Sequence, residues 1–273
     1  MRRIGFISEK GGVAKSTSAL NVAAGLTRRG FRTLLVDLDP QANASLVLLG
    51  GRPAEPPTLG AVLLGDATAA EAVRSTATAG LDVLPADVTL ADANLALTNL
   101  VGRECRLRGA LGTIEDRYDF VVLDTSPQRS LLTINALVYL DEAIVPVDPG
   151  LFAVAGLGQL QAAVEDVRRF LDNRRLRIAG LVLTRTQNNN VSRDVESQLR
   201  GLFGSLVYRT TIPTNAKCEE AHSRYQSVLE YAPRSAGAKA YAELVEEIIA
   251  DGQRTQDGAR VAPGGPVAAD DAA

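Results

Sequence analysis

Six short apolar segments between residues 4 and 184 constrain the fold of this chain most strongly. They are rich in Val, Ile and Leu and show no regular alternation with polar residues. Strands that are buried on both faces have this composition, as in a parallel sheet covered by helices. The predicted strands are Ile4–Ser8, Thr33–Asp37, Leu81–Pro85, Phe120–Asp124, Glu142–Val147 and Ile178–Thr184.

Longer segments with helical spacing of their apolar residues separate these strands. Between Leu157 and Leu171, apolar residues recur every three or four positions and charged residues lie opposite them. This alternation predicts an α/β fold with a doubly wound, mostly parallel sheet flanked by helices. The predicted helices are Lys15–Arg29, Leu90–Leu107, Ala153–Leu171, Arg193–Leu202 and Ala238–Ala250.

The composition changes after Ala250. Residues 251–273 contain many Gly and Pro and few large apolar side chains, which is typical of a disordered tail. The tail has no amphipathic pattern that would lie on a membrane. No apolar run is long enough to span one, and the run at Ile4 is too short for a signal peptide. We therefore predict one domain over residues 1–250.

Composition excludes several classes of function. With 29 Lys and Arg against 32 Asp and Glu, the formal net charge of −3 excludes a uniformly basic coat for nucleic acid, although a local basic face remains possible. Cys105 and Cys218 are isolated, which argues against disulfide, zinc and iron–sulfur sites. His222 is the one histidine, so a Ser-His-Asp or Cys-His mechanism is disfavoured.

A glycine-rich loop follows the first predicted strand and opens the first predicted helix. Backbone N–H groups and a helix N-terminus converge on an anion in such a loop. The pattern K-G-G-x-x-K-[ST] is matched throughout, whereas the ordinary G-x-x-x-x-G-K-[ST] pattern is not. The residues are Lys10, Gly11, Gly12, Val13, Ala14, Lys15, Ser16 and Thr17.

Individual residues of this loop have distinct expected tasks. Lys15 supplies a charge to the β- and γ-phosphates, and Ser16 supplies an oxygen to Mg²⁺. Ala14 stands where the ordinary pattern has its second glycine, and its methyl group restricts the backbone. We expect slower binding or turnover from Ala14, not loss of the site. The alternative interpretation is a glycine-rich turn with surface lysines.

Acidic residues end two of the predicted strands. Asp37 and Asp39 point to the same face at the end of the second strand, beside the loop, where one can support Mg²⁺ and the other an attacking water. The alternative for either acid is a turn or a helix cap. Asp124 follows four apolar residues, as in a Walker B strand whose acid holds a Mg²⁺-bound water.

The chain resembles the ParA/MinD class of deviant Walker A ATPases. The resemblance rests on the loop with its leading lysine, on Val-Asp-Leu-Asp-Pro-Gln at residues 36–41 and on Leu-Asp-Thr-Ser-Pro at residues 123–127. Later segments, including Ile-Pro-Thr-Asn at residues 212–215, are similar to the ParA (Soj-type) branch from Arg3 to about Ile249. Ala14, Ser126, Thr214 and His222 depart from the usual family residues.

The resemblance implies a Mg²⁺-dependent ATPase that forms a nucleotide-sandwich homodimer. It implies that Lys10 reaches the partner subunit's phosphates, that Asp39 positions the hydrolytic water, and that Pro213 and Asn215 border the adenine. It further implies that the ATP-bound dimer binds double-stranded DNA without sequence preference. A ParB-type centromere-binding protein then stimulates slow hydrolysis and releases the dimer. The expected location is cytoplasmic and nucleoid-associated.

One segment is richer in arginine than the rest of the chain. Residues 165–209 hold nine Arg and five acidic residues, a local net charge of +4. Such a face suits phosphate contacts that confer affinity without reading sequence. The alternative is a solvated helix face with local ion pairs. The DNA-binding candidates are Arg174, Arg175, Arg177, Arg193, Arg200 and Arg209, joined by Lys217.

Two other functions stay open at this stage. A cargo-positioning ATPase on the nucleoid would share the ATPase and the DNA binding and differ in its partner. A MinD-like site-placement ATPase would need a C-terminal amphipathic helix, which residues 251–273 do not provide. We therefore expect no membrane partner and favour DNA partitioning.

Overall fold

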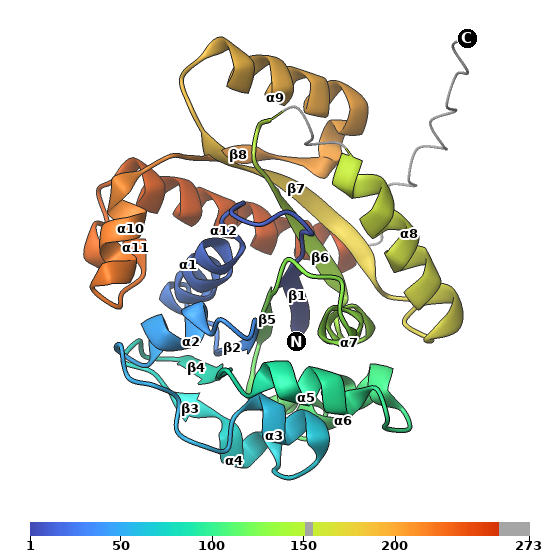
Figure 1. Cartoon of the computed structure of the whole chain (residues 1–273). Coiled ribbons are helices and arrows are strands. Elements are labelled where there is room, and N and C mark those ends of the chain that lie inside the picture. Colours follow the sequence, from blue (N-terminus) through green and yellow to red (C-terminus); the bar gives the residue numbers. More distant parts are fainter. Residues whose placement is uncertain (151–154, 257–273) are drawn as a thin grey trace.

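The chain folds around one eight-stranded sheet. The computed structural model describes residues 1–150 and 155–256. The strand order is β3-β4-β2-β5-β1-β6-β7-β8, and every neighbouring pair is parallel except β3 with β4 (Figure 1). The predicted α/β class is confirmed. The strands are β1 Arg2–Phe6, β2 Thr33–Leu38, β3 Arg74–Ser75, β4 Leu81–Leu84, β5 Phe120–Thr125, β6 Glu142–Val147, β7 Arg177–Thr186 and β8 Val207–Pro213.

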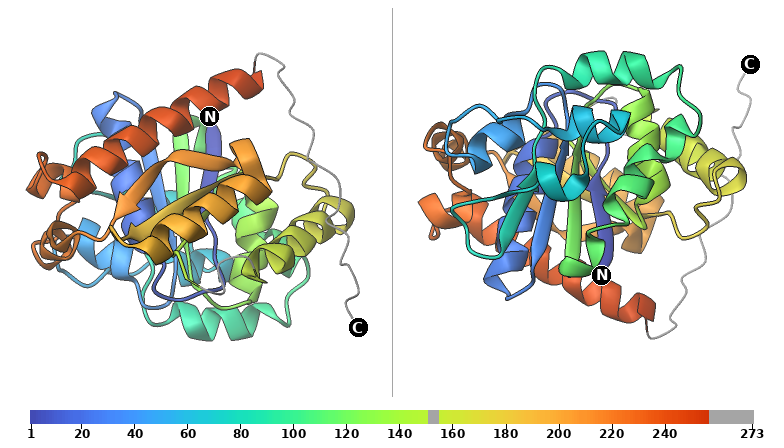
Figure 2. Two further views of the ribbon diagram at one scale, coloured as in Figure 1. Left: turned by 90° about the horizontal axis from the view of Figure 1, so that it is seen from above. Right: turned by 90° about the horizontal axis from the view of Figure 1, so that it is seen from below.

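Helices cover both faces of this sheet (Figure 2). Successive residues of β2 divide between two cores: Leu34 and Val36 belong to one and Leu35 to the other. This explains the unbroken apolar composition of the central strands. The helices are α1 Lys15–Arg28, α2 Asn43–Leu48, α3 Leu59–Leu64, α4 Ala69–Ala72, α5 Leu90–Leu97, α6 Arg106–Leu111, α7 Leu131–Tyr139, α8 Ala155–Phe170, α9 Asn190–Phe203, α10 Ala216–Ser223, α11 Val228–Tyr231 and α12 Ala236–Gln256.

The helix predicted over Leu90–Leu107 is wrong, because the structure divides it. Helix α5 ends at Leu97 and α6 begins at Arg106, with Gly102 at a φ of 66° between them. The buried amide of Asn135 on α7 donates to the Arg103 carbonyl and accepts from the Leu107 N–H. This tertiary contact fixes the break, which local helical spacing cannot reveal.

The predicted C-terminal boundary also differs from the structure, and the prediction missed two regular elements. Helix α12 continues to Gln256, so residues 251–256, predicted as part of the tail, are helical; the rest of the predicted tail, residues 257–273, lies outside the described part of the chain. Asp251, placed in the tail by composition, forms an ion pair with Arg177 at 2.9 Å. Strand β8 and helix α7 were not predicted. β8 is an edge strand with polar residues, and α7 is apolar on nearly all sides.

Candidate nucleotide site

A cleft of about 760 Å³ lies at the carboxyl ends of the central strands. The loop between β1 and α1 forms one side of it, and the segments after β2 and β5 form the others, as expected for an α/β sheet. Further lining comes from α2 and from the end of α10. Its lining residues are Gly11, Gly12, Ala14, Lys15, Ser16, Thr17, Leu20, Asp39, Pro40, Gln41, Asn43, Ala44, Leu46, Val47, Ala91, Ser126, Pro127, Gln128, His222, Ser223 and Tyr225.

Two residues of the phosphate loop adopt left-handed backbone conformations. Gly12 has a φ of 75°, which glycine tolerates without steric cost. Ala14 has a φ of 60° and a ψ of 35° at the N-cap of α1, although it carries a Cβ. For an L-residue this conformation costs roughly 1–2 kcal/mol. The predicted restriction at Ala14 thus takes the form of backbone strain at the point where the helix begins.

Lys15 lies at the base of the cleft with 7% of its surface exposed. Its Nζ donates to the Lys10 carbonyl at 3.2 Å. Burial lowers the pKa of Lys15, and the negative charges of Asp124 and Asp39 oppose this shift. A buried cation at the N-terminus of α1 is suited to attract phosphate.

Asp37 and Asp124 are buried partners on neighbouring strands. Their Cα atoms are paired in the β2–β5 register. The Asp37 carboxylate accepts from the Ser45 N–H at 2.8 Å, the Ser45 hydroxyl at 2.7 Å and the Asp39 N–H at 3.1 Å. Burial nevertheless raises the pKa of Asp37 to about 6. Asp37 therefore fastens α2 to β2, and its oxygens already have partners.

Asp124 has the opposite situation. Both of its carboxylate oxygens are buried and lack a hydrogen-bond partner among the described residues. Burial, followed by repulsion from Asp37, raises the pKa of Asp124 well above its usual range, while Ser16 and Lys15 favour its charged form. Hydroxyl and carboxylate oxygens are the ligands that Mg²⁺ prefers. Ser16 and Asp124 therefore fit a bound magnesium ion better than Asp37 does.

Asp39 and Lys10 differ in their relation to the cleft: Asp39 lines it, whereas Lys10, at the head of the loop, does not. The Asp39 Oδ1 accepts from the Gln41 N–H at 2.9 Å, the contact of a turn acid, and Asp39 also lines the cleft. Lys10 is half exposed, and its Nζ lies 3.6 Å from the Oδ2 of Asp148. The neighbouring Glu9 pairs with Arg129 at 2.7 Å. The head of the loop is thus tied to the segments after β5 and β6.

Pro213 and Asn215 do not line this cleft. They lie where β8 ends and α10 begins, and the Asn215 side chain caps α10 by accepting from the Lys217 N–H at 2.9 Å. Their contact with adenine stays a prediction. His222 and Tyr225, by contrast, line the cleft and were not predicted. The Tyr225 ring packs on Gly51, at a φ of 80°, and no local sequence pattern signals that long-range contact.

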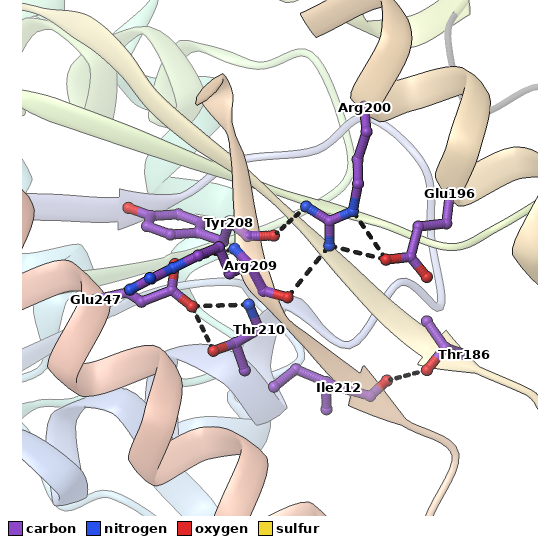
Figure 3. Close-up of polar contacts among 8 residues, drawn as sticks. All are labelled: Thr186, Glu196, Arg200, Tyr208, Arg209, Thr210, Ile212 and Glu247. Atoms are coloured by element: carbon purple, nitrogen blue, oxygen red, sulfur yellow. Dashed lines mark hydrogen bonds and ion pairs between the residues drawn. The ribbon is translucent and has the colours of Figure 1, made fainter. Parts of the chain in front are cut away.

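The arginine-rich segment divides into internal and exposed side chains. Arg200 donates to Glu196 and to the carbonyls of Tyr208 and Arg209, which ties α9 to β8 (Figure 3). Arg177 pairs with Glu142 and Asp251. These two are poorly placed for DNA, so the expectation of a single arginine face is too simple. The exposed candidates are Arg174, Arg175, Arg193, Arg209 and Lys217. Three of them form ion pairs: Arg174 with Asp172, Arg209 with Glu247 and Lys217 with Glu220.

Membrane insertion has no candidate helix in the described residues. Across 1–150 and 155–256, none of the helices combines the length and the apolar character that a bilayer span requires.

Comparison with known proteins finds a matching family model and closely similar sequences. A family model described as an AAA domain matches residues 1–178. The chromosome partitioning protein ParA of Caulobacter vibrioides is 40% identical over 91% of this chain and 94% of its own length. The chromosome-partitioning ATPase Soj of Thermus thermophilus is 40% identical over 92% of this chain and 96% of its own length.

A solved structure extends the likeness to three dimensions. Cobyrinic acid a,c-diamide synthase from Mycobacterium smegmatis, with bound ADP and magnesium, has a TM-score of 0.81 and 30% identity. The match covers 97% of this chain and all of the other. The loop geometry, the two strand-end acids and the extent of the sequence identity agree with one another. The chain belongs to the ParA/Soj family of chromosome-partitioning ATPases.

Proposed function

We propose that this chain is a Mg²⁺-dependent ATPase whose ATP-bound homodimer binds DNA without sequence preference. A ParB-type partner stimulates its slow hydrolysis and so releases it. The main support for nucleotide and metal binding is that Lys15, Ser16 and Asp39 line the cleft, and that Asp124, buried close to Ser16 and Lys15, has no hydrogen-bond partner for its oxygens among the described residues. Family membership and the solved relative with ADP and magnesium support the choice of nucleotide and ion.

The residues of the cleft divide the chemical work. Lys15 and the loop N–H groups hold the β- and γ-phosphates, and Ser16 and Asp124 hold the ion. Magnesium, when bound, neutralises charge that develops on the transferred phosphate. Asp39, which lines the cleft, orients the attacking water. Lys10 leaves Asp148 and reaches the phosphates of the second subunit, so closure of the dimer completes each site.

Exposed arginines provide the DNA-binding surface. Arg174, Arg175, Arg193 and Arg209 are exposed, and Arg174 and Arg209 have side chains about nine-tenths accessible. Phosphate contacts of this kind release counterions and weaken steeply with salt. Pairing two subunits doubles the number of such contacts, which makes DNA affinity depend on the ATP-bound dimer.

Binding to random-sequence duplex DNA tests this proposal. It is measured with ATP, with ADP and without nucleotide, across a salt series. We expect tight binding only with ATP and a steep fall with salt. Binding that is equal in all three states would contradict an ATP-controlled DNA switch. Binding to anionic vesicles in place of DNA would favour the MinD-like alternative.

The role of Asp39 is tested separately. Asp39→Ala should retain ATP binding, lose hydrolysis and keep the dimer on DNA, because the water is no longer oriented. The control is Asp92→Ala, an exposed acid on α5 near the cleft. Hydrolysis by Asp39→Ala at the rate of the unaltered protein would show that this assignment is wrong.

A further inference from the structure

Arg185 occupies an unusual position at the end of β7. Its φ of 55° is left-handed, although it carries a long side chain. In the register with β8, Leu183 pairs with Thr211 and Thr186 pairs with Pro213, so β7 holds one extra residue between the two pairs. This is a β-bulge, a device that redirects a side chain and is common beside active sites. Strained residues of this kind persist where surrounding contacts fix them.

The redirected side chain contacts the phosphate loop. Its guanidinium donates to the Gly12 carbonyl at 2.9 Å. The buried hydroxyl of the preceding residue, Thr184, donates to the Val13 carbonyl at 3.1 Å. Two consecutive residues of β7 therefore hold two consecutive carbonyls of the loop.

Holding these carbonyls also orients the loop N–H groups. In a trans peptide the C=O and the following N–H point in opposite directions within one plane. Fixing the Gly12 and Val13 carbonyls toward β7 therefore turns the N–H groups of Val13 and Ala14 away from β7. Those are the groups that a phosphate loop presents to its anion.

Arg185 is also connected to the neighbouring loop and keeps its charge available. Its carbonyl accepts from the Thr214 hydroxyl at 3.0 Å, beside Pro213 and Asn215. Among the described residues no carboxylate lies within ion-pair distance of its guanidinium, which is exposed. Its positive charge therefore adds to that of Lys15 near the phosphate loop.

We propose that Arg185 is a positioning residue for the nucleotide and not a part of the DNA-binding surface. It holds the phosphate loop in its anion-binding shape through the Gly12 carbonyl. This inference rests on the proposed nucleotide binding but is independent of the proposed DNA binding.

Substitution by glycine separates the side chain from the backbone. Arg185→Gly relieves the left-handed strain and removes the contact with Gly12. We expect an unchanged or higher Tm without nucleotide and about tenfold weaker binding of Mg-ADP, the effect of losing one charged hydrogen bond. A purely structural role would move both quantities in the same direction. The control is Arg117→Ala, an exposed arginine near the amino ends of the strands.

Two further variants keep the test decisive if Arg185→Gly fails to fold. Arg185→Lys retains one charged donor and should bind Mg-ADP within about threefold of the unaltered protein. Arg185→Met keeps the bulk without the donor and should resemble the glycine variant. At saturating ATP, all three variants should bind DNA as the unaltered protein does.

The outcomes separate this inference from the proposed function. Mg-ADP affinity of Arg185→Gly or Arg185→Met equal to that of the unaltered protein would overturn the inference. Weaker DNA binding at saturating ATP would also overturn it and return Arg185 to the DNA surface. Failure of the unaltered protein itself to bind Mg-ADP would instead contradict the proposed function.

Discussion

From the sequence, both the phosphate loop and the arginine-rich segment at residues 165–209 are expected to bind anions. In the structure, their cationic side chains are placed differently. The loop's cation, Lys15, is 7% exposed and faces a cleft with Asp39 beside it. The arginines instead spread over α8, β7, α9, β8 and the loop between α8 and β7. Arg177 and Arg200 are committed to internal contacts, whereas Arg193 is exposed.

This difference shows which kind of sequence pattern predicts where side chains lie in the folded protein. The loop's residues are contiguous and lie between one strand and one helix, so their spacing alone brings them together. A charge count over a long segment carries no such geometry. Whether each arginine is exposed or engaged in internal contacts depends on which carbonyls and acids the tertiary fold places next to it.

The largest expected effect concerns Lys15 of the phosphate loop. Lys15→Ala should weaken nucleotide binding by at least about 100-fold, because it removes the buried cation from the phosphates. Titration with a fluorescent ATP analogue measures this. The control is Lys239→Ala, an exposed lysine on α12. Equal loss in both variants would mean that Lys15 has no special position.

The second prediction concerns the cost of burying acids next to the loop. Asp37 has a pKa of about 6 in the folded protein because of burial, above its value in the unfolded chain. The folded state therefore binds more protons, and this group lowers stability as pH rises from about 4 to about 6. The buried charge of Asp37 therefore destabilises the folded state at neutral pH.

Urea unfolding at pH 4.5 and pH 7, without nucleotide, measures this contribution. Asp37→Asn removes the titrating charge and keeps one acceptor for Ser45. The stability of the variant relative to the unaltered protein should therefore increase between the two pH values. A constant difference would show that the Asp37 carboxyl does not titrate in that window.

The third prediction tests the division of the arginines. Arg200→Ala should lower the free energy of unfolding by about 1–3 kcal/mol, because the carbonyls of Tyr208 and Arg209 lose their donor. Arg193→Ala should leave stability nearly unchanged and weaken ATP-dependent DNA binding. Chemical denaturation and the DNA titration measure the two effects. The reverse pattern would contradict the internal role of Arg200.

The same contrast explains what could be predicted from the sequence. The central strands and the loop were predicted to within a few residues, because buried parallel strands and contiguous motifs carry their own pattern. The break before Arg106 depends on Asn135, and the place of Tyr225 in the cleft depends on Gly51. Such contacts join distant segments, so neither periodicity nor spacing reveals them.

The smallest expected effect concerns strain inside the loop. Ala14→Gly should raise stability by about 0.5–1 kcal/mol, because relief of the left-handed strain exceeds the entropy cost of glycine. Ala42 is a matched control: it has a φ of 52° at the N-cap of α2 and does not line the cleft. Ala42→Gly should raise Tm similarly and leave the affinity for Mg-ATP unchanged.

If the strain at Ala14 also restrains the phosphate loop, only Ala14→Gly should alter Mg-ATP affinity or turnover as well as Tm. Equal effects of Ala14→Gly and Ala42→Gly on Mg-ATP affinity would contradict a special role for strain at Ala14, because relief of strain at Ala42, outside the loop, would then change binding just as much. A lower Tm for Ala14→Gly would mean that the surrounding contacts, and not the absence of a glycine, set this backbone conformation. The loop's shape would then depend on tertiary contacts as much as the positions of the arginines do.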